Sequence, residues 1–265
     1  MRFFVFCNLA SSLALACAAC GSSSSTTPGT SPNDAGEPIS LGDASALPME
    51  TEEGGGKPTV DGGFPIGDGA VVRVDRFATR VISFMPGDCA GFGAAKKPNP
   101  TLGPPIGGGD EEGSLDVLSL GNGGEIVLSF EPNAIVDGPG TDFLVFENPF
   151  LIGGNAMNPT AQPGEVSVSD DGETWKTYPC TATAFPYGAC AGWHTVKSNP
   201  ENGISPVDPA VAGGDPFDLK DVGLTTARFV RIRDKSTDAC PPNPNKVTTN
   251  GFDLDAISIV NAMTP

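Results

Sequence analysis

A set of oxygen-bearing side chains flanks the most apolar segments of the chain, where they could bind a metal ion. Hard cations such as Ca²⁺ take carboxylate, amide and carbonyl oxygens from turn-rich loops. The sequence has no EF-hand spacing, so a calcium site would need ligands from separate segments. The candidates around residues 143–146 and in the last strand are Asp142, Glu147, Asn148, Asp253 and Asp255. We therefore expect a structural calcium site among these residues.

The two aspartates near the C-terminus have a second interpretation. Residues 252–260 are predicted to form a strand, in which Asp253 and Asp255 share a face with the isoleucines that follow. Two carboxylates would then point toward a buried layer, and buried charges require partners. Arg231 or Arg233 could supply these partners in a structural ion network, so metal and network both remain open.

Aromatic side chains are a second kind of candidate site. Trp193 and Tyr187 lie in a Cys-, Gly- and Pro-rich loop, where their amphipathic rings could stack on a sugar. We expect these two residues to bind the ligand. Trp175 ends a predicted hairpin strand, and we expect it to lie in the core.

No group of residues in the sequence requires a catalytic function. The one histidine, His194, has no nucleophile motif such as GxSxG nearby, and we expect it at the surface. Two carboxyl groups across a sugar bond can hydrolyse a glycoside. With 32 acidic residues in the chain, however, such a pair can arise by chance. We expect no enzymatic activity, with polysaccharide hydrolysis as the alternative.

The start of the chain has the pattern of an exported lipoprotein. Arg2 precedes an apolar run to residue 19, which is typical of a secretory leader and short for a membrane span. The segment LACAAC at its end resembles the lipobox of bacterial lipoproteins, in which a cysteine after small residues is diacylated. We place the lipid on Cys20, with residues 1–19 as signal peptide. Cys17 is the alternative lipidation site, and ordinary cleavage without a lipid also remains open.

The next residues indicate a linker followed by one folded domain. Residues 20–63 are rich in Ser, Thr, Pro, Gly and acidic residues, too polar to compensate for the entropy of ordering, so we expect a disordered tether. Residues 64–265 are long enough for a single β domain. The 35 glycines and 26 prolines of the 265-residue chain suit short strands joined by turns. We therefore expect an all-β fold.

The central strand of this domain is predicted at residues 143–146. Its four consecutive apolar residues, FLVF, require cover on both faces. Residues 165–169 alternate polar and apolar side chains, and the Asp-Gly pair at 171–172 can close a hairpin. Further strands are predicted over residues 71–74, 78–84, 114–120, 126–130, 227–233 and 252–260.

Four cysteines lie in the expected domain: Cys89, Cys180, Cys190 and Cys240. A secretory leader implies an oxidising compartment, where four cysteines allow three disulfide pairings. The short separation favours Cys180–Cys190 and leaves Cys89–Cys240. The cysteines lack the CxxC spacing of a metal-thiolate site.

The charge balance restricts the partners. The chain has 32 acidic and 15 basic residues and a formal charge of −17. Such a surface repels phosphate backbones and anionic headgroups, so we expect no nucleic acid partner and membrane contact only through the N-terminal lipid. Divalent cations are natural counterions, although scattered carboxylates also serve simply to keep a protein soluble.

Two resemblances bear on the fold and the location. The segments EVSVSDDGETW and ARFVRI resemble paired strands of discoidin (coagulation factor 5/8 type C) domains. This resemblance implies a jelly-roll sandwich of the galactose-binding-like class, with ligands bound by loops at one end. The wider pattern, with GPGTDFLVFENPF, GGDPFDLKDVGL and GFDLDAIS, is similar to a group of bacterial "cell surface protein" lipoproteins. That similarity implies a location and no chemistry.

The expectation from the sequence is a lipoprotein exported to the outer membrane or cell surface. Its β-sandwich would act as a non-catalytic binding or adhesion module for a glycan or another envelope component, such as a surface protein, with structural Ca²⁺. The alternatives are a polysaccharide-acting glycoside hydrolase and a purely structural envelope protein.

Overall fold

The computed structural model describes residues 63–66, 71–97, 99–237, 239–240 and 250–264. They all belong to the second of two units, Glu52–Pro265. The expected signal peptide and both candidate lipidation cysteines lie outside the described residues. So does the expected tether, residues 20–63, except for Gly63, which begins the first strand.

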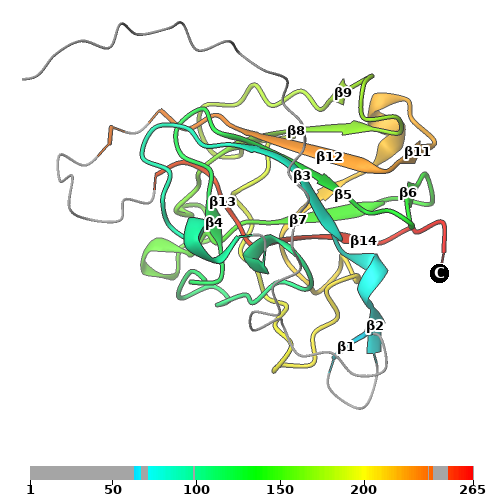
Figure 1. The fold of residues 1–265 in the computed structure, drawn as a ribbon. Coiled ribbons are helices and arrows are strands. Elements are labelled where there is room, and N and C mark those ends of the chain that lie inside the picture. The colour runs from blue at the N-terminus through cyan, green and yellow to red at the C-terminus, as the bar shows by residue number, and fades with distance from the viewer. Residues whose placement is uncertain (1–62, 67–70, 98, 238, 241–249, 265) are drawn as a thin grey trace, which may run out of the picture. The chain divides into compact units, whose positions relative to one another are not determined.

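The regular structure of the described residues consists of short strands and 3-10 helices (Figure 1). The strands are β1 (Gly63–Pro65), β2 (Val71–Arg73), β3 (Arg80–Met85), β4 (Leu118–Ser119), β5 (Glu125–Ser129), β6 (Ile135–Val136), β7 (Phe143–Phe146), β8 (Gly164–Ser169), β9 (Lys176–Thr177), β10 (Asp215–Phe217), β11 (Thr226–Ala227), β12 (Phe229–Asp234), β13 (Asp253–Leu254) and β14 (Ala256–Ile259). The 3-10 helices are η1 (Val74–Arg76), η2 (Ala94–Lys96), η3 (Asn99–Thr101), η4 (Ile152–Gly154) and η5 (Leu219–Val222). The described part of the chain has no helix that is long and apolar enough to span a membrane. The prediction of an all-β fold is confirmed.

Two antiparallel sheets form the main layers. One sheet has the order β3-β5-β12-β8-β9 and the other the order β10-β7-β14. Figure 1 shows β5, β8 and β12 in one layer and β7 and β14 in the other. Leu128 and Ile232 of the first sheet belong to the same apolar cluster as Val145 and Ile257 of the second. The two sheets therefore share one core, an arrangement consistent with a β-sandwich.

Strand β7 is buried on both faces, as its four consecutive apolar residues predict. Phe143 and Val145 belong to the main core between the sheets. Leu144 and Phe146 form a second cluster with Val196 and other apolar residues. This strand thus lies between two apolar layers, and the residues that follow it directly are fixed in place.

The predicted last strand is interrupted at Asp255. Leu254 before the interruption and Ile257 after it both lie in the main core, although side chains three positions apart would point to opposite faces of a regular strand. Asp253 therefore points away from the layer that the isoleucines bury, contrary to the expectation from a continuous strand. The Asp255 carboxylate accepts the Ile106 backbone N–H at 2.9 and 3.2 Å, which holds a loop against the interruption.

The arginines that were candidate partners of these aspartates have other contacts. Arg231 stacks on Trp175, with its Cζ 4.5 Å from the ring centroid, and Arg233 Nε lies 3.9 Å from Glu125 Oε2. Both arginines alternate with core residues along β12, so they lie on the outer face of the five-stranded sheet. Trp175 is consequently a half-buried residue on that face, and its expected place in the core is wrong.

Two disulfides connect parts of the domain. Cys180 and Cys190 are 10 residues apart in sequence with a Cα–Cα distance of 4.5 Å. Cys89 and Cys240 are 151 residues apart with a Cα–Cα distance of 5.9 Å. These are the pairs that the sequence favoured. The short one closes the loop that carries Tyr187.

Candidate binding pocket and carboxylate cluster

A pocket of about 560 Å³ lies beside the end of β7. Its volume falls within the range of sites for small ligands. Polar and aromatic side chains contribute to its lining, among them Asn148, Phe150, Thr160, Gln162, Tyr187 and Asp253. The pocket thus combines hydrogen-bonding groups, aromatic rings and one carboxylate.

Strand ends position two lining residues, Asn148 and Asp253, and Glu147 next to them. Glu147 and Asn148 follow β7 directly, and Asp253 begins β13, where it pairs with β4. Asn148 Nδ2 donates to the Ser114 carbonyl at 2.8 Å. A Cβ on Gly113 would lie 2.6 Å from the Asn148 carbonyl oxygen, so only glycine allows this close approach.

Glu147 and Asp253 form a pair of buried carboxylates at the pocket. Glu147 is 0% exposed and Asp253 is 6% exposed. The Asp253 backbone N–H donates to Glu147 Oε1 at 3.1 Å. In the described part of the chain, however, Glu147 Oε2 and Asp253 Oδ1 have no hydrogen-bond partner. Buried polar atoms in native proteins are nearly always satisfied, so this pair needs a proton, a water molecule or a cation.

Burial raises the pKa of both carboxyl groups. Desolvation is the main cause of the raised pKa of Glu147, and the charge of Asp253 raises it further. Desolvation also raises the pKa of Asp253 to about 6, and the charge of Asp234 raises it further. Two negative charges side by side in a buried site are therefore unfavourable at neutral pH.

Asp215, at the start of β10, connects this region to the histidine. Its Oδ1 lies 2.7 Å from His194 Nδ1, and its Oδ2 accepts the Gly192 N–H at 2.7 Å. Burial raises the pKa of Asp215, and the hydrogen bond from His194 opposes this effect. The His194 side chain is 42% exposed but is stacked on Trp193, with 3.7 Å between the ring centroids. This contact has no signal in the local sequence pattern, because it joins residues 21 positions apart through an unpredicted strand.

The histidine and aspartate do not form a catalytic triad with any described residue. A triad requires a hydroxyl or thiol nucleophile hydrogen-bonded to the histidine. Among the described residues, His194 makes its hydrogen bond to Asp215 alone. The contact with Asp215 therefore orients the His194 ring, and it does not by itself indicate a catalytic role.

The two predicted ligand-binding aromatic residues lie in one aromatic group with Phe185. The Trp193 ring centroid is 5.6 Å from that of Phe185 and 6.3 Å from that of Tyr187. Trp193 Nε1 donates to the Cys190 carbonyl at 2.9 Å, which fixes the indole against the disulfide. Tyr187 lines the pocket, whereas Trp193 is not part of its lining. Trp193 therefore packs beside Tyr187 outside the pocket lining, and ligand binding by these two residues stays a prediction.

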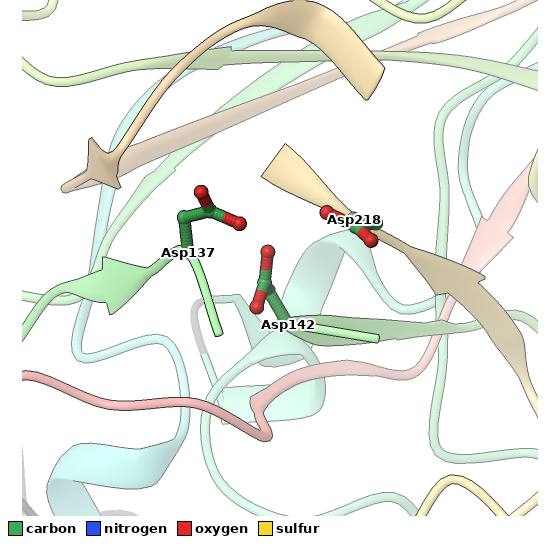
Figure 2. A group of neighbouring side chains, drawn as sticks. All are labelled: Asp137, Asp142 and Asp218. Atoms are coloured by element: carbon green, nitrogen blue, oxygen red, sulfur yellow. The ribbon is translucent and has the colours of Figure 1, made fainter. Parts of the chain in front are cut away.

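Asp142 is separated from the pocket by the length of β7. It lies near Asp137 and Asp218, and one carboxylate oxygen from each lies within 4.8 Å of the others. Figure 2 shows the three carboxylates turned toward one another, beside the end of β6, the start of β7 and the end of β10. Among the described residues, this is the only group in which at least three His, Cys, Asp or Glu side chains lie so close together.

The hydrogen bonds of Asp142 explain its burial. Its Oδ1 accepts from the Gly138 N–H and from Asn261 Nδ2, both at 2.8–2.9 Å, and its Oδ2 accepts the Leu219 N–H at 2.7 Å. Each oxygen of Asp142 is thus satisfied by the protein. We interpret Asp142 as a structural carboxylate that joins a turn, a 3-10 helix and the residues after β14.

Comparisons with known proteins do not assign the chain to a family: no family model and no curated protein matches it. The site must therefore be interpreted from its geometry. The structure brings together Asn148, Asp253 and Tyr187 of the predicted residues, with Glu147 directly behind them. It places Asp142 and Asp255 elsewhere. The lining residues Phe150, Thr160 and Gln162 were missed, because the long loop between β7 and β8 has no periodic pattern.

Proposed function

We propose that this chain is a non-catalytic binding domain of the bacterial cell surface whose ligand is a glycan. The pocket beside β7 carries the proposal. Sugars present apolar C–H faces together with many hydroxyl groups. The Tyr187 ring can stack on such a face, while Asn148, Thr160 and Gln162 offer hydrogen bonds to hydroxyls.

The charge of the protein favours a neutral glycan over a polyanion. The formal charge of −17 repels anionic polymers at long range, and the carboxylate of Asp253 at the pocket repels them at short range. Nucleic acid is excluded as a ligand class in this proposal for the same reason. A surface protein that carries a neutral glycan could be the partner in this proposal.

The proposal includes the location of the domain. Residues 1–19 serve as a lipoprotein signal peptide, and Cys20, or Cys17 as the alternative, carries the lipid. The tether expected from the sequence lies outside the described residues except for Gly63, and in this proposal it would hold the domain away from the outer membrane. The antiparallel sheets with a shared core support a jelly roll of the galactose-binding-like class as the finer description of the sandwich.

Glycoside hydrolysis is the second candidate function, and the raised pKa values of Glu147 and Asp253 favour it. A glycosidase needs a protonated carboxyl group at the leaving oxygen and a second carboxylate that reaches the sugar. Glu147 is 0% exposed, and only Asp253 of the pair lines the pocket. Because one carboxyl group cannot reach a substrate, binding without catalysis is the better interpretation.

A glycan array with the purified full-length chain tests these alternatives. We expect binding to one class of neutral oligosaccharide, at least tenfold weaker binding by Tyr187→Ala, and no release of reducing ends. A tenfold loss corresponds to about 1.4 kcal/mol, within the range of a stacked aromatic ring. Trp175→Ala removes a half-buried aromatic residue from the outer face of the other sheet and should bind like the wild type.

Two outcomes would replace the proposal. Released reducing ends that disappear in Asp253→Asn would identify a hydrolase. Retention on no oligosaccharide and no cell-wall fraction would favour a purely structural envelope protein.

A further inference from the structure

We propose that Glu147 and Asp253 bind a divalent cation, of the size and ligand preference of Ca²⁺, between the two carboxylates and next to the pocket. This site goes beyond the proposed function, and its evidence does not depend on a glycan. It rests on two neighbouring buried carboxylates that each have one oxygen without a partner in the described part of the chain.

The other buried carboxylates of the domain provide an internal comparison. Each of them has both oxygens hydrogen-bonded to N–H groups, and they are Asp142, Asp215, Asp234 and Asp255. Glu147 and Asp253 are the exceptions among the described residues. They are also in contact with each other through the Asp253 N–H. In a fold that satisfies its other buried carboxylates so consistently, one oxygen on each of these two residues is left for another partner.

No positive side chain compensates this pair within the described residues. Every ion pair found for a described lysine or arginine is with another carboxylate, and His194 contacts Asp215. A divalent cation would supply the missing charge, and both free oxygens would become ligands. Binding one ion in this way removes the repulsion between the two carboxylates.

The donor atoms at the site are those that calcium prefers. Carboxylate and amide oxygens are hard ligands, and Ca²⁺ accepts six to eight of them in irregular geometry. Asn148 directs its amide nitrogen to the Ser114 carbonyl, so its amide oxygen is a third candidate donor. No cysteine or histidine lies in the pocket lining, which disfavours zinc.

The pocket gives the ion a route from solvent. Asp253 is part of the lining, and Asn148 lies beside it there. The protein offers fewer donors than calcium requires, so water or sugar hydroxyls from the pocket would complete the coordination. Cation and glycan would then bind to adjacent positions in the same pocket.

The cluster of Asp137, Asp142 and Asp218 does not carry the same inference. Both oxygens of its buried member, Asp142, are already hydrogen-bonded by the protein. Asp137 is exposed, and exposed acidic groups are common without a metal ion. This cluster therefore serves as the natural control site.

The test is calcium binding by the purified full-length chain after dialysis against EDTA, measured by isothermal titration and by thermal unfolding. We expect wild-type protein to bind Ca²⁺ at one saturable site and its unfolding midpoint to rise by several degrees at a hundredfold excess over Kd. Asp253→Asn and Glu147→Gln keep the side-chain shape and should each weaken Ca²⁺ binding at least tenfold. Asp137→Asn should leave it unchanged.

Measurements on the wild-type protein alone can overturn the proposal, so the proposal can be tested even if a variant fails to fold. No heat of binding and the same midpoint in EDTA and in millimolar Ca²⁺ would show that the carboxylates hold no cation. A loss of binding in Asp137→Asn with retention in Asp253→Asn would move the site to the other end of β7. Because no sugar is present, this result is independent of the glycan array.

Discussion

The pH dependence of stability provides a quantitative test of the buried pair. In the absence of divalent cations, burial raises the pKa of Asp253 from 3.8 to about 6. A carboxyl group with a raised pKa in the folded state binds more protons when folded than when unfolded over this interval. Its ionisation therefore lowers stability as the pH rises from about 4 to above 6. The shift of about two units corresponds to roughly 3 kcal/mol.

Asp253→Asn isolates this contribution, because asparagine has nearly the same shape and does not ionise. We expect the wild type to lose roughly 3 kcal/mol relative to the variant between pH 4 and pH 7 in EDTA. Urea unfolding at several pH values, with both proteins measured in parallel, gives this difference. Contributions from carboxyl groups that do not interact with Asp253 largely cancel in the comparison, whereas removing the charge of Asp253 also lowers the pKa of Glu147 in the variant.

A constant difference between the two proteins across this interval would refute the reasoning. So would a wild type that gains stability relative to the variant as the pH rises. A constant difference would mean that the pKa of Asp253 is the same in the folded and unfolded states, and a gain would mean that it is lower in the folded state.

Three further predictions concern the support of the site. Leu144→Ala, in the second apolar cluster, should lower the free energy of unfolding by about 2–5 kcal/mol in urea, because it leaves a cavity beside β7. Replacing Cys180 and Cys190 with serine should lower stability by roughly 3 kcal/mol under oxidising conditions, the entropy of closing a loop of that length, which thermal unfolding can measure. Gly113→Ala forces a Cβ against the Asn148 carbonyl, so Ca²⁺ titration should show weaker binding while circular dichroism stays native.

Features with a local cause were predictable from the sequence. The four consecutive apolar residues of β7 are buried only if both faces of the strand are covered, and one apolar cluster lies against each face. The hairpin after β8 also follows a local rule. Gly172 has a φ of 75°, and Asp171 Oδ1 accepts the N–H groups of Glu173 and Thr174. Asp171 therefore organises the turn, and these bonds hold the pKa of its exposed carboxyl group well below the usual range.

Features with a long-range cause were not predictable. In a continuous strand, Asp253 and Asp255 would share the face of Ile257 and Ile259. The strand is interrupted at Asp255, whose carboxylate accepts the Ile106 backbone N–H, so this prediction fails. Trp175 lies over Arg231 because a strand distant in sequence places the guanidinium beneath its ring. Neither contact has a signal in the local pattern, because each joins segments that are far apart in the sequence.

The central claim is that the pocket beside β7 binds a glycan without cleaving it. The most direct measurement is titration calorimetry of the best oligosaccharide from the array, with wild type, Tyr187→Ala and Trp175→Ala measured alike. The account predicts saturable binding by the wild type, at least tenfold weaker binding by Tyr187→Ala, an unchanged Trp175→Ala, and intact sugar at the end. Equal affinity of all three proteins, or cleavage of the sugar during the titration, would contradict it.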